Sequence, residues 1–145
     1  MKKISSKGRY ALYAMIDIAE HHIGEWVTVG GIAERQGIPV KYLEQIVISL
    51  TRSGLLQSRR GLQGGYMLKK SPEQYTVGEI LRAIEGKLAP VACLADDINQ
   101  CKRKDICKTL PLWHELYDTI NNYFDSITLK DLSYSVRFSV DFTGG

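Results

Sequence analysis

Apolar residues recur at helical spacing in three successive segments near the start of the chain. The first helix is predicted over about 6–22. The second is predicted over about 29–36, with Thr28 as its N-terminal cap and Gly37 as the residue that ends it. The third is predicted over about 39–52, with a proline at its first position and one continuous apolar face. The pattern therefore indicates two short helices joined by a tight turn, after a longer helix.

The pattern then changes to two short runs that are typical of strands. These runs cover 55–59 and 66–69, and the glycine-rich segment 61–65 joins them. A capping-box motif at 76–79 predicts another short helix, which Gly86 should end. This arrangement indicates a β-hairpin followed by a return to helix.

The last third of the chain contains an irregular segment, a long helix and a tail. Residues 87–109 have no clean period, whereas 111–126 reads as a long helix and 128–132 as a final helical turn. Apolar residues alternate with polar ones over 136–142, which is the pattern of a strand or of a disordered tail that happens to alternate. The long helix and its end carry one broad apolar stripe: Trp113, Leu116, Tyr117, Ile120, Phe124 and Ile127.

This order of elements predicts a mainly α protein with a small β-wing, that is, a winged helix-turn-helix followed by a long dimerisation helix. The expected organisation is a DNA-binding domain over 1–86, a cysteine-bearing loop over 87–110, a dimerisation helix over 111–132 and a C-terminal tail over 133–145. A winged helix-turn-helix places one helix in the major groove of double-stranded DNA.

Composition and charge agree with such a role. The 145-residue chain is 44% hydrophobic and has a net charge of +3, with a pI of about 8.7. No segment approaches the roughly 20 apolar residues of a membrane span, and no signal peptide is apparent, so we expect a cytoplasmic protein without membrane contact. Basic residues cluster around the expected wing: Arg52, Arg59, Arg60, Lys69 and Lys70.

The third helix offers side chains that suit base recognition. Lys41 and Gln45 lie four residues apart on one face, where Gln45 can pair with an adenine edge and Lys41 can reach a phosphate or a guanine. Glu44 can accept a hydrogen bond from a cytosine amino group. The alternative is a solvated polar helix face with no ligand.

The wing offers Arg59, Arg60 and the glycines that follow, including Gly64. Glycines let a backbone approach phosphates closely, and arginine can enter the minor groove. The alternative is an ordinary surface hairpin, but helix, turn, helix and basic wing occur here in the right order.

All three cysteines fall in the irregular segment, with the spacing Cys93-x7-Cys101-x5-Cys107. A zinc ribbon would show paired Cys-x2-Cys motifs, and three thiols cannot all pair within the chain. Loose spacing of soft thiolates is compatible with an iron–sulfur cluster, and four nearby lysine and arginine residues favour the thiolate form. The alternative is three cysteines without a ligand.

The chain resembles the IscR/NsrR/CymR family of winged-helix transcription regulators over about 1–132. The resemblance rests on Ser-Lys-Gly-Arg-Tyr-Ala at 6–11, Glu-Arg-Gln-Gly-Ile at 34–38, Tyr-Leu-Glu-Gln at 42–45 and Gly-Gly-Tyr at 64–66. It implies a homodimer that binds a DNA operator, with Glu44, Gln45 and Arg60 at the DNA surface. It also implies a role for Glu44 in choosing between two classes of DNA site.

The resemblance also implies a cluster held by Cys93, Cys101 and Cys107, with 2Fe-2S favoured over 4Fe-4S. The iron–sulfur regulators carry a histidine three residues after the third cysteine, and here Leu110 stands at that position. His114 is seven residues past Cys107, which on a helix is about 10 Å further along the axis, so it could be a ligand only if the helix starts after it. We therefore expect the fourth ligand to be an oxygen from water, from a partner subunit or from an aspartate: Asp96, Asp97 or Asp105.

Two other functions compete with an iron–sulfur-sensing regulator. A nitric-oxide or thiol-redox sensor of the same family would differ in whether the protein carries a coloured cluster. A zinc-binding adaptor without DNA contact would be revealed by bound zinc. An enzyme is not expected, because no Ser/His/Asp set, phosphate loop or paired carboxylates are apparent. His21 and His22 are interpreted as helix-surface residues rather than as cluster ligands.

Overall fold

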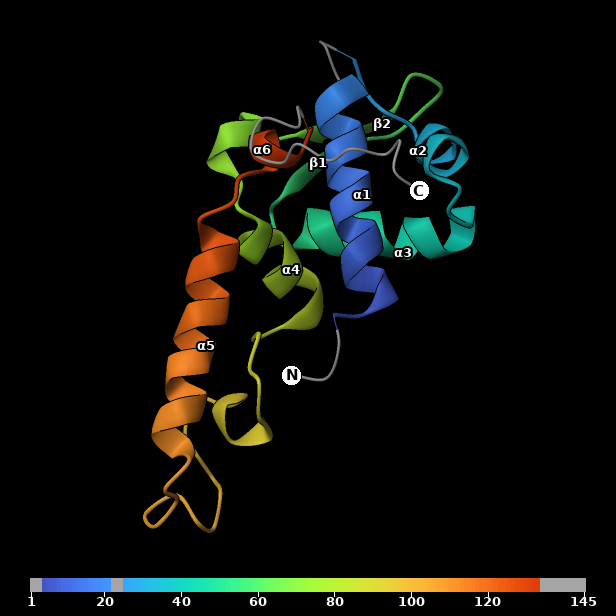
Figure 1. The fold of residues 1–145 in the computed structure, drawn as a ribbon. Coiled ribbons are helices and arrows are strands. Elements are labelled where there is room, and N and C mark those ends of the chain that lie inside the picture. Colours follow the sequence, from blue (N-terminus) through green and yellow to red (C-terminus); the bar gives the residue numbers. More distant parts are fainter. Residues whose placement is uncertain (1–3, 22–24, 134–145) are drawn as a thin grey trace, which may run out of the picture.

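The computed structural model describes residues 4–21 and 25–133, and it has the mainly helical fold that the pattern predicts (Figure 1). The helices are α1 (Ser6–His21), α2 (Val29–Gln36), α3 (Val40–Arg52), α4 (Val77–Glu85), α5 (Leu110–Asp125) and α6 (Leu129–Ser133). Two 3-10 turns, Pro72–Gln74 and Ala92–Leu94, lie between them. His22 and the alternating segment 136–142 lie outside the described residues.

A two-stranded antiparallel sheet forms the wing. β1 (Leu56–Arg59) pairs with β2 (Gly65–Leu68) in a register that sets Arg59 opposite Gly65. Val27 adds a single bridge to this hairpin, because its amide and carbonyl exchange hydrogen bonds with Tyr66 at 2.9 and 2.8 Å. The wing is thereby attached to the segment that leads into α2.

Helix α1 is the centre of the core. It packs against α2, α3, α4 and α6, and Ala11, Ala14, Met15 and Ile18 on its inner face are fully buried. Burial of such a face is the main stabilising contribution that an amphipathic helix makes. This core holds the helix-turn-helix and the wing in fixed positions.

Tyr75 connects three parts of the core. Its buried hydroxyl donates a hydrogen bond to the Leu55 carbonyl at 2.7 Å and accepts one from the Lys69 amide at 2.8 Å. Its carbonyl accepts a hydrogen bond from the Leu129 amide at 3.0 Å. Burial raises the pKa of this phenol, so it stays protonated and continues to donate.

Helix α5 extends away from the body and carries the cysteine loop beside its far end (Figure 1). None of its side chains is fully buried. Arg82 of α4 donates a hydrogen bond to Asn121 at 3.0 Å and forms an ion pair with Asp125, so the two helices are joined near the end of α5. Within the described residues, no helix is long and apolar enough to cross a membrane.

Two local expectations differ from the structure. Pro39 precedes α3 as its cap, with an extended ψ of 131°, rather than occupying the first helical position. The expected capping box on α4 forms only in part. Thr76 accepts a hydrogen bond from the Glu79 amide at 3.0 Å, but the Glu79 carboxylate accepts one from the Lys70 ammonium at 3.0 Å instead of turning back to Thr76.

Candidate nucleic-acid interface and cysteine loop

The turn between α2 and α3 is built from local interactions. Thr28 caps α2 by accepting a hydrogen bond from the Gly31 amide at 3.0 Å. Gly37 ends α2 with φ 66°, in the left-handed region where a residue with a Cβ is strained. These two residues set the chain direction that brings α3 across α2.

Helix α3 is strongly amphipathic. Its inner face, Leu43, Ile46, Val47 and Leu50, is fully buried. The predicted DNA-reading residues Lys41, Glu44 and Gln45 are all exposed on its opposite side. The structure thus leaves these three side chains together at the surface.

The wing glycines are required by the hairpin itself. A Cβ on Gly64 would lie 2.1 Å from the Arg59 carbonyl oxygen, and one on Gly65 would lie 2.5 Å from the Val27 carbonyl oxygen. Gly64 is buried, whereas Arg59 and Arg60 are exposed. The close packing of the backbone therefore leaves both arginine side chains outside.

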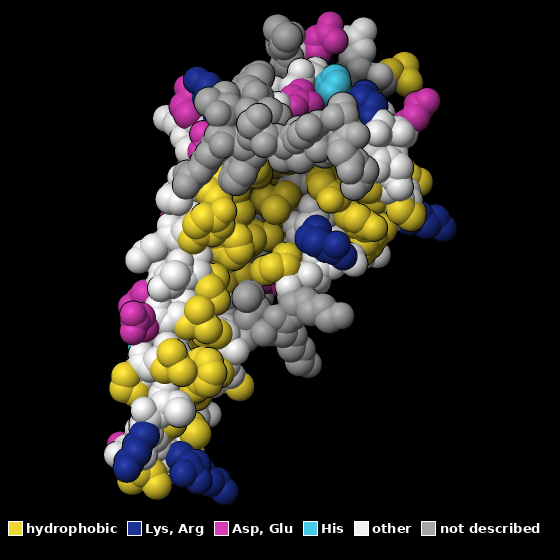
Figure 2. Space-filling view, in the orientation of Figure 1, with side chains coloured by type: hydrophobic (Ala, Val, Ile, Leu, Met, Phe, Trp, Pro, Cys, Tyr) yellow, Lys and Arg dark blue, Asp and Glu magenta, His cyan; other side chains and the backbone are white. Residues whose placement is uncertain are grey.

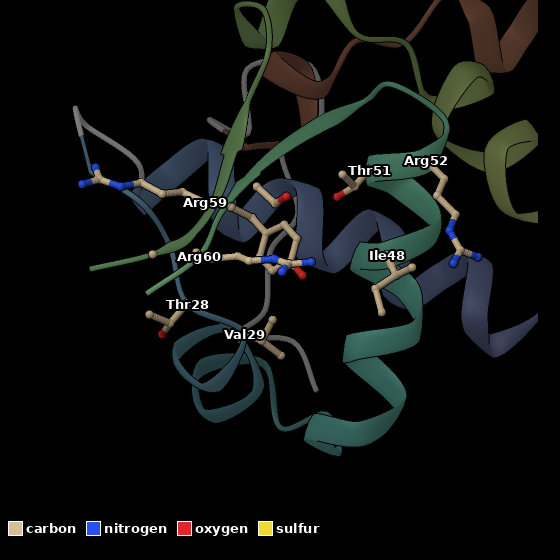
Figure 3. A pocket seen from close by; sticks show the side chains of 11 residues that line it. Thr28, Val29, Ile48, Thr51, Arg52, Arg59 and Arg60 are labelled. Carbon is tan, nitrogen blue, oxygen red and sulfur yellow. The ribbon is translucent and has the colours of Figure 1, made fainter. Parts of the chain in front are cut away.

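A groove of about 500 Å³ lies between α3 and the wing (Figure 3). Among the predicted DNA-binding residues, Arg59, Arg60 and Gly64 line it from the wing, whereas Lys41, Glu44 and Gln45 lie on α3 beyond its lining. The groove is also lined by residues that were not predicted as site residues: Thr28, Val29, Ile48, Thr51, Arg52, Ser58, Gly65 and Tyr66. Helical spacing from Lys41 and Gln45 could have identified Ile48 and Arg52.

A buried carboxylate fixes α2 against α1. Asp17 is 0% exposed and accepts hydrogen bonds from Arg35 at 2.7 and 2.9 Å and from Gln36 at 2.9 Å. Burial alone would raise the pKa of this carboxyl, but the hydrogen bonds from Arg35 and Gln36 hold it below its usual value. Asp17 therefore remains ionised beneath the helix-turn-helix. His21 lies beside it on the helix surface, as expected, with Nδ1 2.8 Å from the Asp17 carbonyl oxygen.

The three cysteines are free thiols on one loop between α4 and α5. Cys93 and Cys101 line a common cavity of about 310 Å³ together with Asp96, and Cys107 is not part of that lining. Within the described ranges, no group of three or more His, Cys, Asp or Glu side chains is gathered as a metal site. The donor set suits an iron–sulfur cluster in its chemistry, and two of the three thiol-bearing residues line the same cavity.

The surroundings of Cys107 affect its thiol, and those of His114 bear on the choice of a fourth ligand. A hydrogen bond with Thr109 lowers the pKa of the Cys107 thiol, with a smaller contribution from Arg103. His114 lies within α5, and it lines a second cavity of about 210 Å³ that Cys93 and Asp96 also line. Asp97 pairs with Lys87, so its carboxylate is already engaged. Asp96 is therefore the aspartate that the structure places beside two cysteines.

Comparisons with known proteins agree with this architecture. Residues 4–135 match the Rrf2 family model, described as iron-dependent transcriptional regulator. The HTH-type transcriptional regulator IscR of Pectobacterium carotovorum is 39% identical over 130 residues, which covers 90% of this chain and 78% of that protein. The IscR of Escherichia coli O1:K1 is 38% identical with similar coverage, 90% and 79%.

Solved structures of two regulators are also similar to this one. The global cysteine regulator CymR of B. subtilis matches with a TM-score of 0.75 and 36% identity, covering 93% of this chain and 98% of that chain. The IscR of T. potens matches with a TM-score of 0.73 and 34% identity, covering 99% and 96%. These relatives are transcription regulators and not enzymes. This chain shares their winged helix-turn-helix fold. This chain accordingly belongs to the Rrf2 family, in which it is an IscR-like transcriptional regulator.

Proposed function

We propose that this regulator senses iron–sulfur cluster status through a cluster held by Cys93, Cys101 and Cys107. The observation that carries the proposal is the placement of all three thiols on one loop, with Cys93 and Cys101 at a common cavity. Thiolates are the usual protein ligands of such clusters. The family description as iron-dependent and the similarity to IscR support the same assignment.

Asp96 is our candidate for the fourth ligand. It lines both cavities that Cys93 lines, and one of these also contains Cys101. A carboxylate oxygen holds iron less firmly than a thiolate, so the cluster would be open to loss at that iron. We favour a 2Fe-2S cluster over a 4Fe-4S cluster because of the resemblance to the iron–sulfur regulators of this family.

We further propose that the regulator acts as a cytoplasmic homodimer through α5. Leu112, Leu116 and Tyr123 are 55%, 37% and 50% exposed on one side of this helix. Figure 2 shows hydrophobic side chains continuing along α5 onto the body of the molecule. An exposed apolar stripe on a projecting helix fits a second copy of the chain, and two copies would read two half-sites about one helical turn apart.

On the DNA side, we propose that Lys41, Glu44 and Gln45 face the major groove while Arg59 and Arg60 follow the backbone and minor groove. The exposure of the three α3 side chains and the two wing arginines supports this assignment. The wing conformation requires glycine at position 64, since a side chain there would collide with the Arg59 carbonyl oxygen. Contacts of these two kinds supply sequence preference and general affinity respectively.

The cysteine loop can couple cluster occupancy to DNA affinity. Its first residues are anchored, because Leu88 is buried beside Leu81 and Ile127, and the Asn121 amide donates a hydrogen bond to the Leu88 carbonyl at 3.1 Å. A cluster that orders the rest of the loop would change how α5 is held against α4. That change would alter the spacing of the two recognition helices in a dimer, which is a coupling between two distinct sites.

The test is anaerobic purification followed by absorption and Mössbauer spectroscopy, iron and sulfide analysis, and DNA binding before and after cluster removal. We expect a coloured protein with one cluster per chain and a DNA affinity that changes when the cluster is removed. Colourless protein that contains zinc would contradict the cluster and support a zinc site. A coloured protein that binds no DNA sequence would contradict the proposal that the cluster regulates DNA binding.

A thiol-redox sensor is the second candidate. Cys101 is exposed, so its thiol is accessible to oxidants, and exposed lysines and an arginine follow it in the sequence. One of the similar solved structures is described as the oxidized form of Staphylococcus aureus CymR. If metal-free protein changes its DNA affinity on treatment with hydrogen peroxide, and Cys101→Ser abolishes the change, this candidate is favoured.

A further inference from the structure

Ile48 is a hydrophobic residue on the solvent-exposed side of α3, opposite the face that packs into the core. The four residues of the buried face are 0% exposed, whereas Ile48 is 43% exposed. It therefore contributes little to the core, and its removal should not create a cavity. Val40 is the other exposed large hydrophobic residue of α3, at 45%, but it lies at the start of the helix, whereas Ile48 lies between Gln45 and Arg52 on the exposed face.

Its position on the helix is that of a base-reading residue. Ile48 follows Gln45 by three residues and precedes Arg52 by four, so the three side chains share one face of α3. Ile48 also lines the groove between α3 and the wing. Figure 3 shows Ile48 and Arg52 on the α3 side of that groove and Arg59 and Arg60 on the hairpin.

The charge of the groove indicates what occupies it. Three arginines line it, Arg52, Arg59 and Arg60, and no carboxylate is among its lining residues. Two copies of this chain meeting at the groove would bring these like charges together, whereas a polyanion would be attracted. Double-stranded DNA is the polyanion that fits a recognition helix beside a wing.

An isoleucine can make only an apolar contact with a base pair. The apolar group that the major groove presents among the four unmodified bases is the C5-methyl group of thymine. We propose that Ile48 contacts a thymine methyl group in the operator and so selects a T·A pair at one position of each half-site. This inference rests on the DNA-binding function and adds the chemical group that one residue reads.

The experiment uses full-length protein and an operator selected by the wild type from random duplexes. Each thymine in the operator is replaced in turn by deoxyuracil, which removes the methyl group and keeps every hydrogen-bonding group. At one thymine per half-site we expect the replacement to weaken wild-type binding about fourfold, the effect of losing one buried methyl-sized group. Replacements at the other thymines, which Ile48 does not touch, serve as the control duplexes.

Ile48→Ala completes a double-mutant cycle. We expect Ile48→Ala to bind the thymine operator about fourfold more weakly and to lose the response to deoxyuracil at that one position. Ile48→Val, which shortens the side chain by one carbon, should keep part of the response and guards against a folding defect in the alanine variant. Gln45→Ala should keep the full deoxyuracil response because its amide reads a different base pair.

Two outcomes would each overturn the inference. One is that deoxyuracil has no effect on wild-type binding at any thymine. The other is that the deoxyuracil effect is unchanged in both Ile48 variants. If the wild type selects no operator at all, the DNA-binding function itself is contradicted. If it selects one and the cycle shows no coupling, only the methyl contact is wrong.

Discussion

The Arg35 guanidinium of α2 binds the fully buried carboxylate of Asp17 in α1, with Nη2 and Oδ1 2.7 Å apart. Asp17 and Arg35 are the only charged side chains that join these two helices by an ion pair in the described part of the chain. Because α2 and its turn set the position of α3, this pair is a support of the DNA-binding surface rather than part of it.

Asp17→Asn should destabilise the fold by about 2 kcal/mol, because a neutral amide loses the charge-assisted hydrogen bonds from Arg35. Urea unfolding followed by circular dichroism measures the change. Asp125→Asn is the matched control, since the Arg82–Asp125 pair is partly exposed on both sides and should contribute less than about 1 kcal/mol. Equal effects of the two substitutions would show that burial of Asp17 is not the decisive feature.

The same pair predicts an acid dependence. The pKa of Asp17 is lower in the folded protein than the usual value, so the folded state binds fewer protons than the unfolded chain in that range. Its stabilisation is complete above the unfolded pKa of about 4 and is lost as pH falls from there through the lower folded pKa. The difference in free energy of unfolding between wild type and Asp17→Asn should therefore shrink below about pH 4. A difference that stays constant from pH 6 to pH 3 would contradict this assignment.

Gln45→Ala and Arg60→Ala should weaken DNA binding in different ways. Loss of a base contact at Gln45 should cost about 1–3 kcal/mol at one base pair and relax the preference there. Loss of Arg60 should weaken binding to all sequences. It should also reduce the slope of the logarithm of the binding constant against the logarithm of the salt concentration by about one. Binding to a panel of single-base operator variants at two salt concentrations separates the two effects. Lys130→Ala, an exposed position on α6, is the control for general charge.

Alanine at Cys93, Cys101 or Cys107 should abolish the visible absorption of the anaerobically purified protein, because the proposed cluster is held by all three thiolates. Asp96→Ala should leave a cluster that is lost faster in air, since Asp96 lines the cavity that Cys93 and Cys101 share. His114→Ala should leave the absorption largely intact. Loss of the cluster in His114→Ala, with retention in Asp96→Ala, would assign the fourth ligand to the histidine that lines the neighbouring cavity.

Leu116→Glu should give folded monomers, because a charge would be placed in the exposed apolar stripe of α5. Sedimentation velocity at micromolar concentration reports the oligomeric state, and circular dichroism reports the fold. The corresponding change at Ile120 or Phe124 is a poorer test, because both side chains are partly buried against a hydrophobic cluster of their own subunit. A monomeric wild type would contradict the homodimer.

The sequence by itself determined the helices, the turn and the wing. Thr28, Gly37 and the apolar face of α3 act through neighbouring residues, since capping, left-handed backbone and helical period are local properties. The same holds for the hairpin around the wing glycines. These elements could be predicted because each is stabilised within a few residues of chain.

Only the tertiary structure decided how those elements use their side chains. The apolar stripe of the long helix divides: Ile127 is buried against α4, whereas Leu116 remains exposed. Glu79 pairs with Lys70 instead of completing its capping box, and Asp17 is an ionised residue in the core because Arg35 and Gln36 reach it from another helix. The cavity shared by two cysteines and the groove beside Ile48 arise in the same way, since packing between distant segments is not encoded in any local period.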